Sequence, residues 1–136
     1  MKQYIGTKVI MAEPQEKDGK PGYKVQYEDG YISWSPKDVF EKAYNCFDGG
    51  MNFGQAVELM KQGFKVAREG WNGKGMFLFL AHNVDIETAA DLSCVSHLEG
   101  ELCLPSIVMK TADDHFVVGW LASQTDMLAE DWKIHN

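Results

Sequence analysis

A short run of turn-forming residues, Asp48-Gly49-Gly50, divides the sequence into two parts. Two adjacent glycines after an aspartate favour a flexible joint, and the methionine that follows resembles a second start. Because the chain has only 136 residues, each part must build a small core of its own. We therefore expect two modules, residues 1–46 and 51–136, in one α+β chain.

Charge is distributed unevenly between these parts. The net charge is −7; residues 1–44 carry seven lysines and seven acidic residues, whereas the rest carries six basic and thirteen acidic residues. Binding to DNA or RNA requires many phosphates to be neutralised, so this charge predicts no nucleic-acid polymer as a partner. No apolar run approaches the roughly 20 residues that cross a bilayer, and no signal peptide is visible. We expect no membrane partner and a location in the cytoplasm.

The first module is predicted to be a small β-hairpin followed by a helix. The stretch KQYIGTKVIMAE has strand composition, and Asp29-Gly30 between two aromatic, β-branched runs is a strong hairpin signal. A helix should follow in SPKDVFEKAY, with Ser35 as its cap and Pro36 in its first turn. So small a module has few residues for a core, and we expect it to dock on the second module or on a neighbouring subunit.

The second module is predicted to be a small twisted antiparallel sheet with one packed helix. Apolar residues recur at helical spacing after Asn52, the expected cap, and Gly63 fits the helix end. Strands are expected in FKVAREGW, in MFLFLA and in the hairpin LPSIVMKTADDHFVVGWL, whose short connections require antiparallel pairing. A polar insertion at 82–101, with a short helix around 88–94, has little pattern. ASQTDMLAEDWKI should hold one helical turn, capped by Thr125, before a last strand.

The stretch REGWNGKGMFLFL, residues 68–80, places glycines and an indole in front of an apolar run. A phosphate-binding glycine loop needs a helix after it and, in a P-loop, a lysine followed by Ser or Thr. Here a strand-like run follows, which predicts a turn between two strands. Trp71 on this turn then has three explanations, which are packing in the core, a subunit interface, or stacking on a base or ribose. Asn72 suits a base edge or a left-handed turn position.

Residues with catalytic or metal-binding chemistry form no known pattern. The histidines are scattered, at His82, His97, His115 and His135. They lack a Ser or Cys partner with an acidic residue to orient them, so we predict no enzyme. The cysteines are Cys46, Cys94 and Cys103, an odd number that favours buried free thiols over disulfides. Cys94 and Cys103, together with His97, are conceivable zinc ligands, but no Cys-x-x-Cys pair is present. We predict no metal and no cofactor.

The blocks MNFGQAVELMKQGFKVAREGWNGKGMFLFL, LPSIVMKTADDHFVVGW and LASQTDMLAEDW resemble a small phage and prophage domain, the second Thoeris anti-defence family. The similarity runs from Met51 to about Ile134. Residues 1–46 are similar to a module on other small phage proteins, and many family members lack it. The resemblance implies a sponge and not an enzyme. Such a sponge binds glycocyclic ADP-ribose, the signal of bacterial TIR-domain defence proteins, and in some members also cyclic dinucleotides such as cGAMP at separate sites.

The resemblance further implies a homotetramer, in the cytoplasm of the infected host, with ligand pockets where subunits meet. The ligand-binding residues that it implies are Phe53, Arg68, Trp71, Asn72, Gly73, Lys74, Ser123, Gln124, Thr125 and Asp126. Trp71 would stack a base. Arg68 and Lys74 would face a pyrophosphate or would be solvated surface charges. Thr125 and the amides after it would hold a phosphate, and Asp126 would accept from a ribose hydroxyl or an adenine amine, or would cap a helix.

Two other functions compete with the sponge. A cyclic-nucleotide hydrolase would need a nucleophile or a general base with a shifted pKa, and it would release a cleaved product. A phage protein-interaction or virion accessory module would use the aromatic hairpin of residues 1–46, since Trp and Tyr dominate interface hot spots. That module predicts a protein partner and no nucleotide binding, whereas the sponge predicts the reverse.

Overall fold

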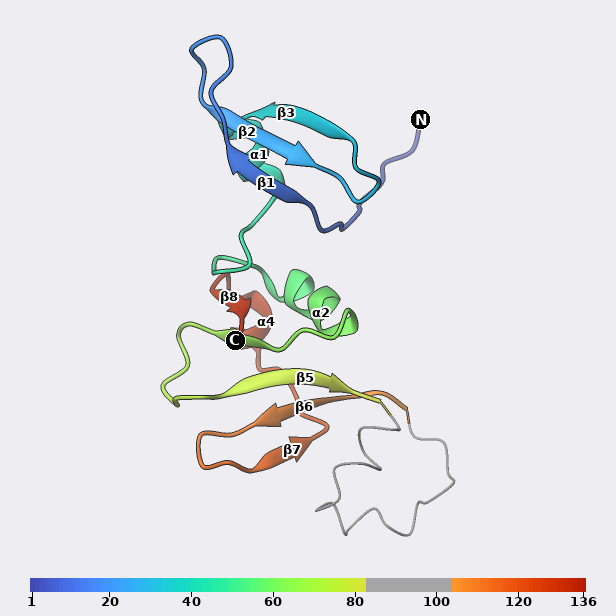
Figure 1. Cartoon of the computed structure of the whole chain (residues 1–136). Helices are drawn as coiled ribbons and strands as arrows, with labels where there is room; N and C mark the ends of the chain where they lie inside the picture. The colour runs from blue at the N-terminus through green and yellow to red at the C-terminus, as the bar shows by residue number, and fades with distance from the viewer. Residues whose placement is uncertain (83–103) are drawn as a thin grey trace. The chain divides into compact units, whose positions relative to one another are not determined.

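Figure 1 shows the protein as a computed structural model that describes residues 1–82 and 104–136. Two compact units make up the chain, Met1–Cys46 and Phe47–Asn136. Antiparallel sheets with a few short helices confirm the predicted α+β class. The assignment of ligand binding to the second part stays a prediction. Within the described ranges, no helix is long and apolar enough to span a bilayer.

The first unit is a three-stranded antiparallel sheet with a short helix (Figure 1). β1 (Met11–Pro14), β2 (Gly22–Gln26) and β3 (Ile32–Pro36) pair in chain order, and α1 (Lys37–Ala43) follows. The β2–β3 hairpin turns at the predicted Asp29-Gly30, where Gly30 has φ 87° and its N–H donates to Tyr27 O at 2.9 Å. The left-handed conformation at this position explains the glycine.

The N-terminal strand is shorter than predicted. We expected it from Lys2 onward, but β1 begins at Met11. Met11 pairs with Gln26, which is the last residue of β2. After Gln26 the chain leaves the sheet and enters the turn of residues 27–31. Residues before Met11 therefore have no β2 partner to hydrogen-bond, and strand composition alone does not make them a strand.

Two side chains near the end of this unit differ from their predicted roles. Ser35 does not cap α1, because it lies in β3 opposite Tyr23. Pro36 occupies the cap position instead of the first turn, and no side chain makes the capping hydrogen bond. Cys46, which we expected to be buried, is exposed. The cap prediction was wrong because β3 extends to Pro36, the residue immediately before α1.

The second unit is a five-stranded antiparallel sheet. Its strands are β4 (Val66–Arg68), β5 (Phe77–Ala81), β6 (Ser106–Lys110), β7 (Phe116–Val118) and β8 (Trp132–Ile134), in the order β7-β6-β5-β4-β8. β4 and β5 are antiparallel, so the glycine-rich stretch between them is a turn between strands, as predicted. The predicted β6–β7 hairpin is also present. β8 pairs with β4, which brings the last strand of the chain beside the first strand of this unit.

Helix α2 (Phe53–Lys61) packs on β4, β5 and β8 of this sheet (Figure 1). Asn52 Oδ1 accepts from the Gln55 N–H at 2.8 Å, and Gln55 Oε1 accepts from the Asn52 N–H at 3.0 Å. This reciprocal pair is a capping box. Gly63, at φ 93°, follows the last turn, and the amides of residues 63 and 64 donate back into the helix. Both predicted ends of the helix are confirmed.

The core lies between α2 and the sheet. Its buried members are Met51, Ala56, Leu59, Met60, Val66, Leu78, Met109 and Trp132. Trp132 is 0% exposed and contributes the largest side chain. Met51 and Trp132 exchange two backbone hydrogen bonds of 3.0 Å, so the start of the unit is joined to its last strand. The candidate site described next is attached to this core through Trp132.

We expect Asn52→Ala to lower the free energy of unfolding by about 1 kcal/mol, because the first turn of α2 loses its side-chain acceptor. Urea titration followed by tryptophan fluorescence measures the change. Asn52→Ser is the matched control and should stay close to wild type, since serine keeps an acceptor at the same place. Equal stability of all three proteins would show that the capping box contributes nothing to this fold.

Candidate functional site

Arg68, the last residue of β4, binds two carboxylates. Its Nη1 donates to Asp126 Oδ1 and its Nε donates to Asp131 Oδ1, both at 2.9 Å. The side chains of Arg68 and Asp126 are only 15% and 13% exposed. Arg68 lies two residues after Val66 and so points to the same, core-facing side of the sheet. It is an internal cation that joins β4 to the C-terminal segment, and not a solvated surface charge.

Asp126 accepts most of the hydrogen bonds in this cluster. Its Oδ1 accepts from Arg68 and, at 3.4 Å, from Trp71 Nε1; its Oδ2 accepts from the Ser123 N–H and hydroxyl at 3.1 and 2.8 Å. Its backbone oxygen accepts from Trp132 Nε1 at 3.0 Å. A carboxylate has about four acceptor positions, so this one is saturated. Two roles were predicted for Asp126, which are accepting a hydrogen bond from a ligand and capping a helix. The structure shows the capping role.

Helix α4 (Gln124–Leu128) begins two residues earlier than predicted. Ser123, and not Thr125, is its cap: Ser123 Oγ accepts from the Asp126 N–H at 3.1 Å, and the Asp126 carboxylate accepts from the Ser123 N–H. Ser and Asp three positions apart form a capping box, which outcompetes the threonine. Thr125 lies inside the first turn and is exposed. The phosphate site predicted at a Thr125 cap therefore loses its structural basis.

Three tryptophans meet beside this cluster. Trp71 packs edge to face on Trp132 and on Trp120, with ring centroids 5.5 and 6.2 Å apart. Phe53, the first residue of α2, lies 5.3 Å from Trp132 on another side. Such aromatic pairs contribute about 0.5–1.5 kcal/mol beyond burial. Trp71 is half-buried against the core. Core packing therefore accounts for the buried part of its ring, and the exposed part is available to a ligand or to a neighbouring subunit.

The turn that carries Trp71 is fixed at its base. The Gly70 N–H donates to Asp131 Oδ2 at 2.9 Å, so the carboxylate that holds Arg68 also holds the turn. At the tip, Asn72 and Lys74 are exposed and residue 73 is half-buried. The amide of Asn72 and the ammonium of Lys74 are therefore accessible beside the indole.

The predicted site residues fall into three groups. One connected cluster contains Phe53, Arg68, Trp71, Ser123 and Asp126. Asn72, Gly73 and Lys74 adjoin it through the turn, whereas Gln124 and Thr125 are exposed on α4. Sequence reasoning missed Asp131, Trp120 and Trp132. The signal for Asp131 was available, because an arginine on a core-facing strand position requires a carboxylate partner.

The carboxylates of the cluster are ionised at neutral pH. Burial raises the pKa of Asp126, but the hydrogen bonds from Arg68 and Ser123 outweigh burial and leave the pKa below its usual value. The hydrogen bond from Arg68 lowers the pKa of Asp131, and hydrogen bonds to these two carboxylates raise the pKa of Arg68. Two negative charges and one positive charge leave a net charge of −1 in the cluster. No member of it exchanges a proton readily near pH 7.

Residues 1–82 and 104–136 contain no group of three or more His, Cys, Asp or Glu placed to hold a metal ion. The conceivable zinc ligands Cys94, His97 and Cys103 lie outside these ranges. The predicted insertion at 82–101, apart from its first residue, and the helix predicted around 88–94 also lie outside them. The absence of a metal site and of a cofactor stays a prediction for the whole chain.

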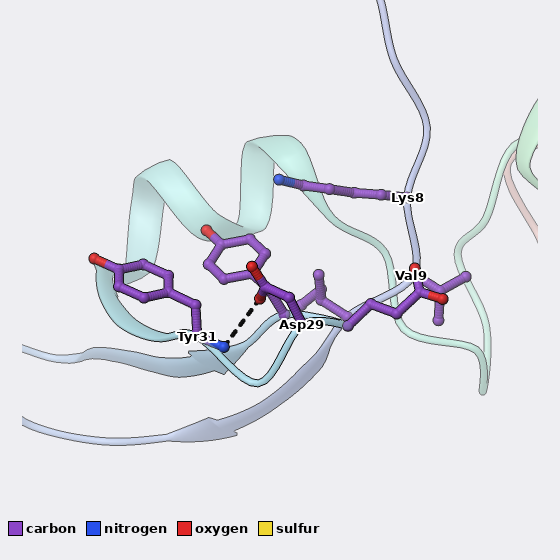
Figure 2. Close-up of a pocket in the computed structure, with 7 residues that line it drawn as sticks. Lys8, Val9, Asp29 and Tyr31 are labelled. Atoms are coloured by element: carbon purple, nitrogen blue, oxygen red, sulfur yellow. Dashed lines mark hydrogen bonds between the residues drawn. The ribbon is translucent and has the colours of Figure 1, made fainter.

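A separate hollow of about 470 Å³ lies in the first unit (Figure 2). Its lining residues are Lys8, Val9, Ile10, Tyr27, Glu28, Asp29 and Tyr31. The Lys8 ammonium lies 4.5 Å from the centre of the Tyr27 ring, in the arrangement of a cation–π pair. None of the predicted ligand-binding residues lines this hollow. The hollow and the tryptophan cluster are therefore distinct features of distinct units.

Comparison with known proteins identifies relatives of the second unit. Residues 51–135 match the model of a family described as the Thoeris anti-defense 2-like domain. The chain is also similar to a protein named Thoeris anti-defense 2 from Bacillus phage SP01, with 43% identity over 84 residues, which are 62% of this chain and 93% of that protein. The family match contains the whole tryptophan and carboxylate cluster, and it does not extend into the first unit.

Replacement of Arg68 should be the most damaging single change in the cluster. Arg68→Met leaves two carboxylates without their cation, and we expect a loss of about 3 kcal/mol in the free energy of unfolding. Lys61→Met is the matched control, because Lys61 forms an exposed pair with Glu58 at 3.9 Å, and such pairs contribute about 0–1 kcal/mol. Urea titration compares the two variants; similar losses would contradict the central role of Arg68.

Acid should destabilise the second unit through Asp126 and Asp131. Their folded-state pKa values lie below the unfolded value of about 3.9. Their contribution is therefore fully present above about pH 4 and is lost as the pH falls through the folded-state pKa values. Burial also lowers the pKa of His135, so this histidine withdraws stability as the pH falls below its unfolded value of about 6.5. Urea titrations at several pH values should show the carboxylate effect as a further decline below about pH 4.

The double variant Asp126→Asn/Asp131→Asn tests the origin of this decline. It should be less stable at pH 7 and should depend less on acid than wild type. Glu130→Gln, at an exposed position of the same C-terminal segment, is the control. An acid decline that persists unchanged in the double variant would assign the effect to other carboxylates.

Proposed function

The chain belongs to the Thoeris anti-defense 2-like family, which gives it a phage anti-defence role, and we propose that it performs this role by sequestering a nucleotide signal. The proposed ligand is glycocyclic ADP-ribose, a cyclic nucleotide derived from TIR-domain enzymes. Bound ligand would be withheld from the Thoeris effector without being cleaved. A cyclic dinucleotide such as cGAMP is the second ligand to test. The family name describes an anti-defence role and no reaction, which is consistent with a non-catalytic protein.

The observation that supports capture over cleavage is the saturated state of the central carboxylates. A general acid or base needs a pKa near the working pH and a position open to the substrate. Asp126 has every acceptor position filled, and its pKa is below the usual value. Asp131 is likewise paired with Arg68 and with the Gly70 amide. Such an arrangement suits a rigid binding surface better than proton transfer.

The same contacts prepare Trp71 for stacking. Its ring is held edge to face between Trp120 and Trp132, and its indole N–H points to Asp126. A ring fixed in advance loses little conformational freedom when a ligand binds. Stacking of one base on an aromatic side chain contributes about 1–3 kcal/mol. We therefore assign the base of the ligand to the exposed part of Trp71.

Charge decides where the phosphates would lie. The cluster has a net charge of −1 at neutral pH and disfavours a phosphate next to Asp126. Lys74, exposed at the tip of the turn, keeps its charge available, and Asn72 offers amide donors nearby. In this proposal the pyrophosphate faces the tip of the turn, and Arg68 positions the site without touching the ligand.

Subunit contacts would complete the pocket. We propose a homotetramer in the cytoplasm of the infected bacterium, with each ligand held where subunits meet. The half-buried rings of Trp71 and Trp120 leave apolar area that a neighbouring subunit would cover. Light scattering after size-exclusion chromatography measures the mass of the assembly with and without ligand.

Capture followed by release tests the proposed function. The protein is mixed with glycocyclic ADP-ribose or with cGAMP, free ligand is removed by filtration, and the retained protein is heat-denatured. Mass spectrometry then identifies the released compound. Intact ligand that appears only after denaturation is the expected result. A cleaved product would indicate a hydrolase, and passage of both ligands through the filter would favour a protein-interaction module.

Two substitutions should weaken capture while the fold persists. We expect Lys74→Met to weaken binding about tenfold, the effect of about 1.4 kcal/mol, because an exposed cation near the phosphates is lost. Trp71→Phe should weaken it less than Trp71→Ala, since phenylalanine keeps a stacking face but loses the indole N–H. Isothermal titration measures affinity, and circular dichroism verifies folding. Exposed Lys61→Met is the matched control for Lys74→Met and should bind as wild type.

A further inference from the structure

One side of the five-stranded sheet faces away from α2. Val66, Leu78 and Met109 belong to the core under this helix, and successive residues of a strand point to opposite faces. Their neighbours on the other side form two rows across β6, β5, β4 and β8, and we call these rows the outer face. The first row consists of Lys110, Phe77, Ala67 and Lys133, and the second consists of Val108, Phe79, Lys65 and His135.

The outer face has packing of its own. Ala67 and Val108 are buried, yet they do not belong to the core cluster under α2. The ring of Phe77 stacks on the ring of His135, with centroids 4.7 Å apart. The Lys65 ammonium lies 4.8 Å from the centre of the Phe77 ring, in a cation–π contact. The rings and cations of this face therefore form one ordered layer and are not independent surface side chains.

Positive charge is concentrated on the outer face. From Asn45 onward the chain has six basic and thirteen acidic residues. Three of the basic residues, Lys65, Lys110 and Lys133, lie in the two rows, whereas no acidic residue does. Asp114, in the β6–β7 turn, pairs with Lys110 at 2.7 Å. Among residues 1–82 and 104–136, no carboxylate forms an ion pair with Lys65 or Lys133. An acidic part of the chain thus keeps two uncompensated cations on one side of its sheet.

These cations act on one histidine. Burial lowers the pKa of His135, and the positive charges of Lys65, Lys110 and Lys133 lower it further. The three lysines reach the imidazole from the start of β4, from β6 and from β8, while Phe77 of β5 stacks on it. His135 is therefore neutral at pH 7 and has one N–H to donate. An anion placed between the lysines and this ring would relieve their mutual repulsion.

We propose that Lys65, Lys133 and His135 bind a phosphate dianion, in the form of inorganic phosphate or of a phosphate monoester. The two lysines without carboxylate partners match the charge of about −1.5 to −2 that a phosphate monoester carries near pH 7. His135 adds a hydrogen-bond donor, and Lys110 is already compensated by Asp114. A phosphate diester has a single charge and would leave one of the two lysines unbalanced. The charges of the outer face therefore favour a terminal phosphate group.

This site is separate from the tryptophan and carboxylate cluster. Trp71 and Trp132 pack against the core on the α2 side of the sheet, whereas Lys133 points to the outer face because it follows Trp132 directly in β8. The inference goes beyond the proposed function and does not rest on it. The signal proposed there is a cyclic nucleotide whose pyrophosphate faces Lys74, and the outer face would take a different class of anion.

Titration of the full chain with four compounds tests the site. The compounds are inorganic phosphate, AMP as a monoester, cyclic AMP as a diester, and adenosine, which has no phosphate. Chloride keeps the ionic strength constant, because salt alone screens the repulsion between the lysines. NMR signals of the histidine rings are the readout, and His135→Asn identifies the signals of His135. This readout is local, so binding of a compound elsewhere on the chain does not imitate the expected result.

We expect inorganic phosphate and AMP to shift the signals of His135 and to raise its pKa, because a bound dianion stabilises the imidazolium. Cyclic AMP should bind at least fivefold more weakly than AMP, and adenosine should have no effect. Tighter binding of AMP than of inorganic phosphate would identify a monoester as the ligand, with its base on the rings of Phe79 and Phe116, which lie 6.3 Å apart. Equal affinities would identify the phosphate group alone. Either result supports the site.

Substitutions separate the outer face from the rest of the unit. Lys65→Met and Lys133→Met should each weaken the binding of AMP at least fivefold, with circular dichroism to verify folding. Lys61→Met, exposed on α2 at the other side of the sheet, is the matched control and should bind as wild type. Lys74→Met should also bind AMP as wild type, so this proposal and the proposed function fail separately.

Four results would overturn the proposal. The first is an equal response of the His135 signals to phosphate and to chloride. The second is binding of adenosine as tight as that of AMP, and the third is equal binding of cyclic AMP and AMP. The fourth is a loss of AMP binding in Lys61→Met as large as the loss in Lys65→Met.

Discussion

The ion pairs of Arg68 join β4 of the second unit to the C-terminal segment at a largely buried point. One guanidinium joins β4 to Asp126 and Asp131, which lie 58 and 63 residues further along the chain. Asp126 caps α4 and holds the indoles of Trp71 and Trp132, and Asp131 fixes the base of the glycine turn. Removing a cation from two partly buried carboxylates costs more than an exposed pair contributes. The geometry around Trp71 thus depends on the charge of Arg68.

This dependence shapes the kind of function that the unit can have. Groups that are fully paired are strong positioning elements and poor proton carriers, because every proton transfer would break a hydrogen bond with Arg68, Ser123 or Gly70. The aromatic surface beside them is fixed before any ligand arrives, and preorganised surfaces bind with a smaller loss of entropy. A protein that captures a small signal needs both properties, while an enzyme would need a group that the cluster leaves open.

The two units are stabilised by different kinds of contact. The second unit buries eleven hydrophobic residues among those described, including an indole at 0% exposure, and adds a buried ion cluster. The first unit buries Val25 alone and relies on cross-strand pairs, stacked rings and the hydrogen bond of Trp34 Nε1 to Gln15 O at 2.9 Å. A single thin sheet has two faces, and one short helix covers only one of them. The first unit therefore depends more on these local contacts than on a buried core.

The sequence alone determined the features whose contacts are local. The capping box of Asn52, the left-handed Gly63, the turn at Asp29-Gly30 and the turn that carries Trp71 all join residues within a few positions, so their patterns can be read directly. The capping box of Ser123 and Asp126 is equally local, although the sequence analysis chose Thr125 instead. Only the tertiary structure decided that Arg68 binds Asp126 and Asp131 and that residues before Met11 lack a strand partner. Those outcomes depend on strand register and on side chains brought together from distant segments. The composition and spacing of the sequence do not specify this register, because the packing of the core sets it.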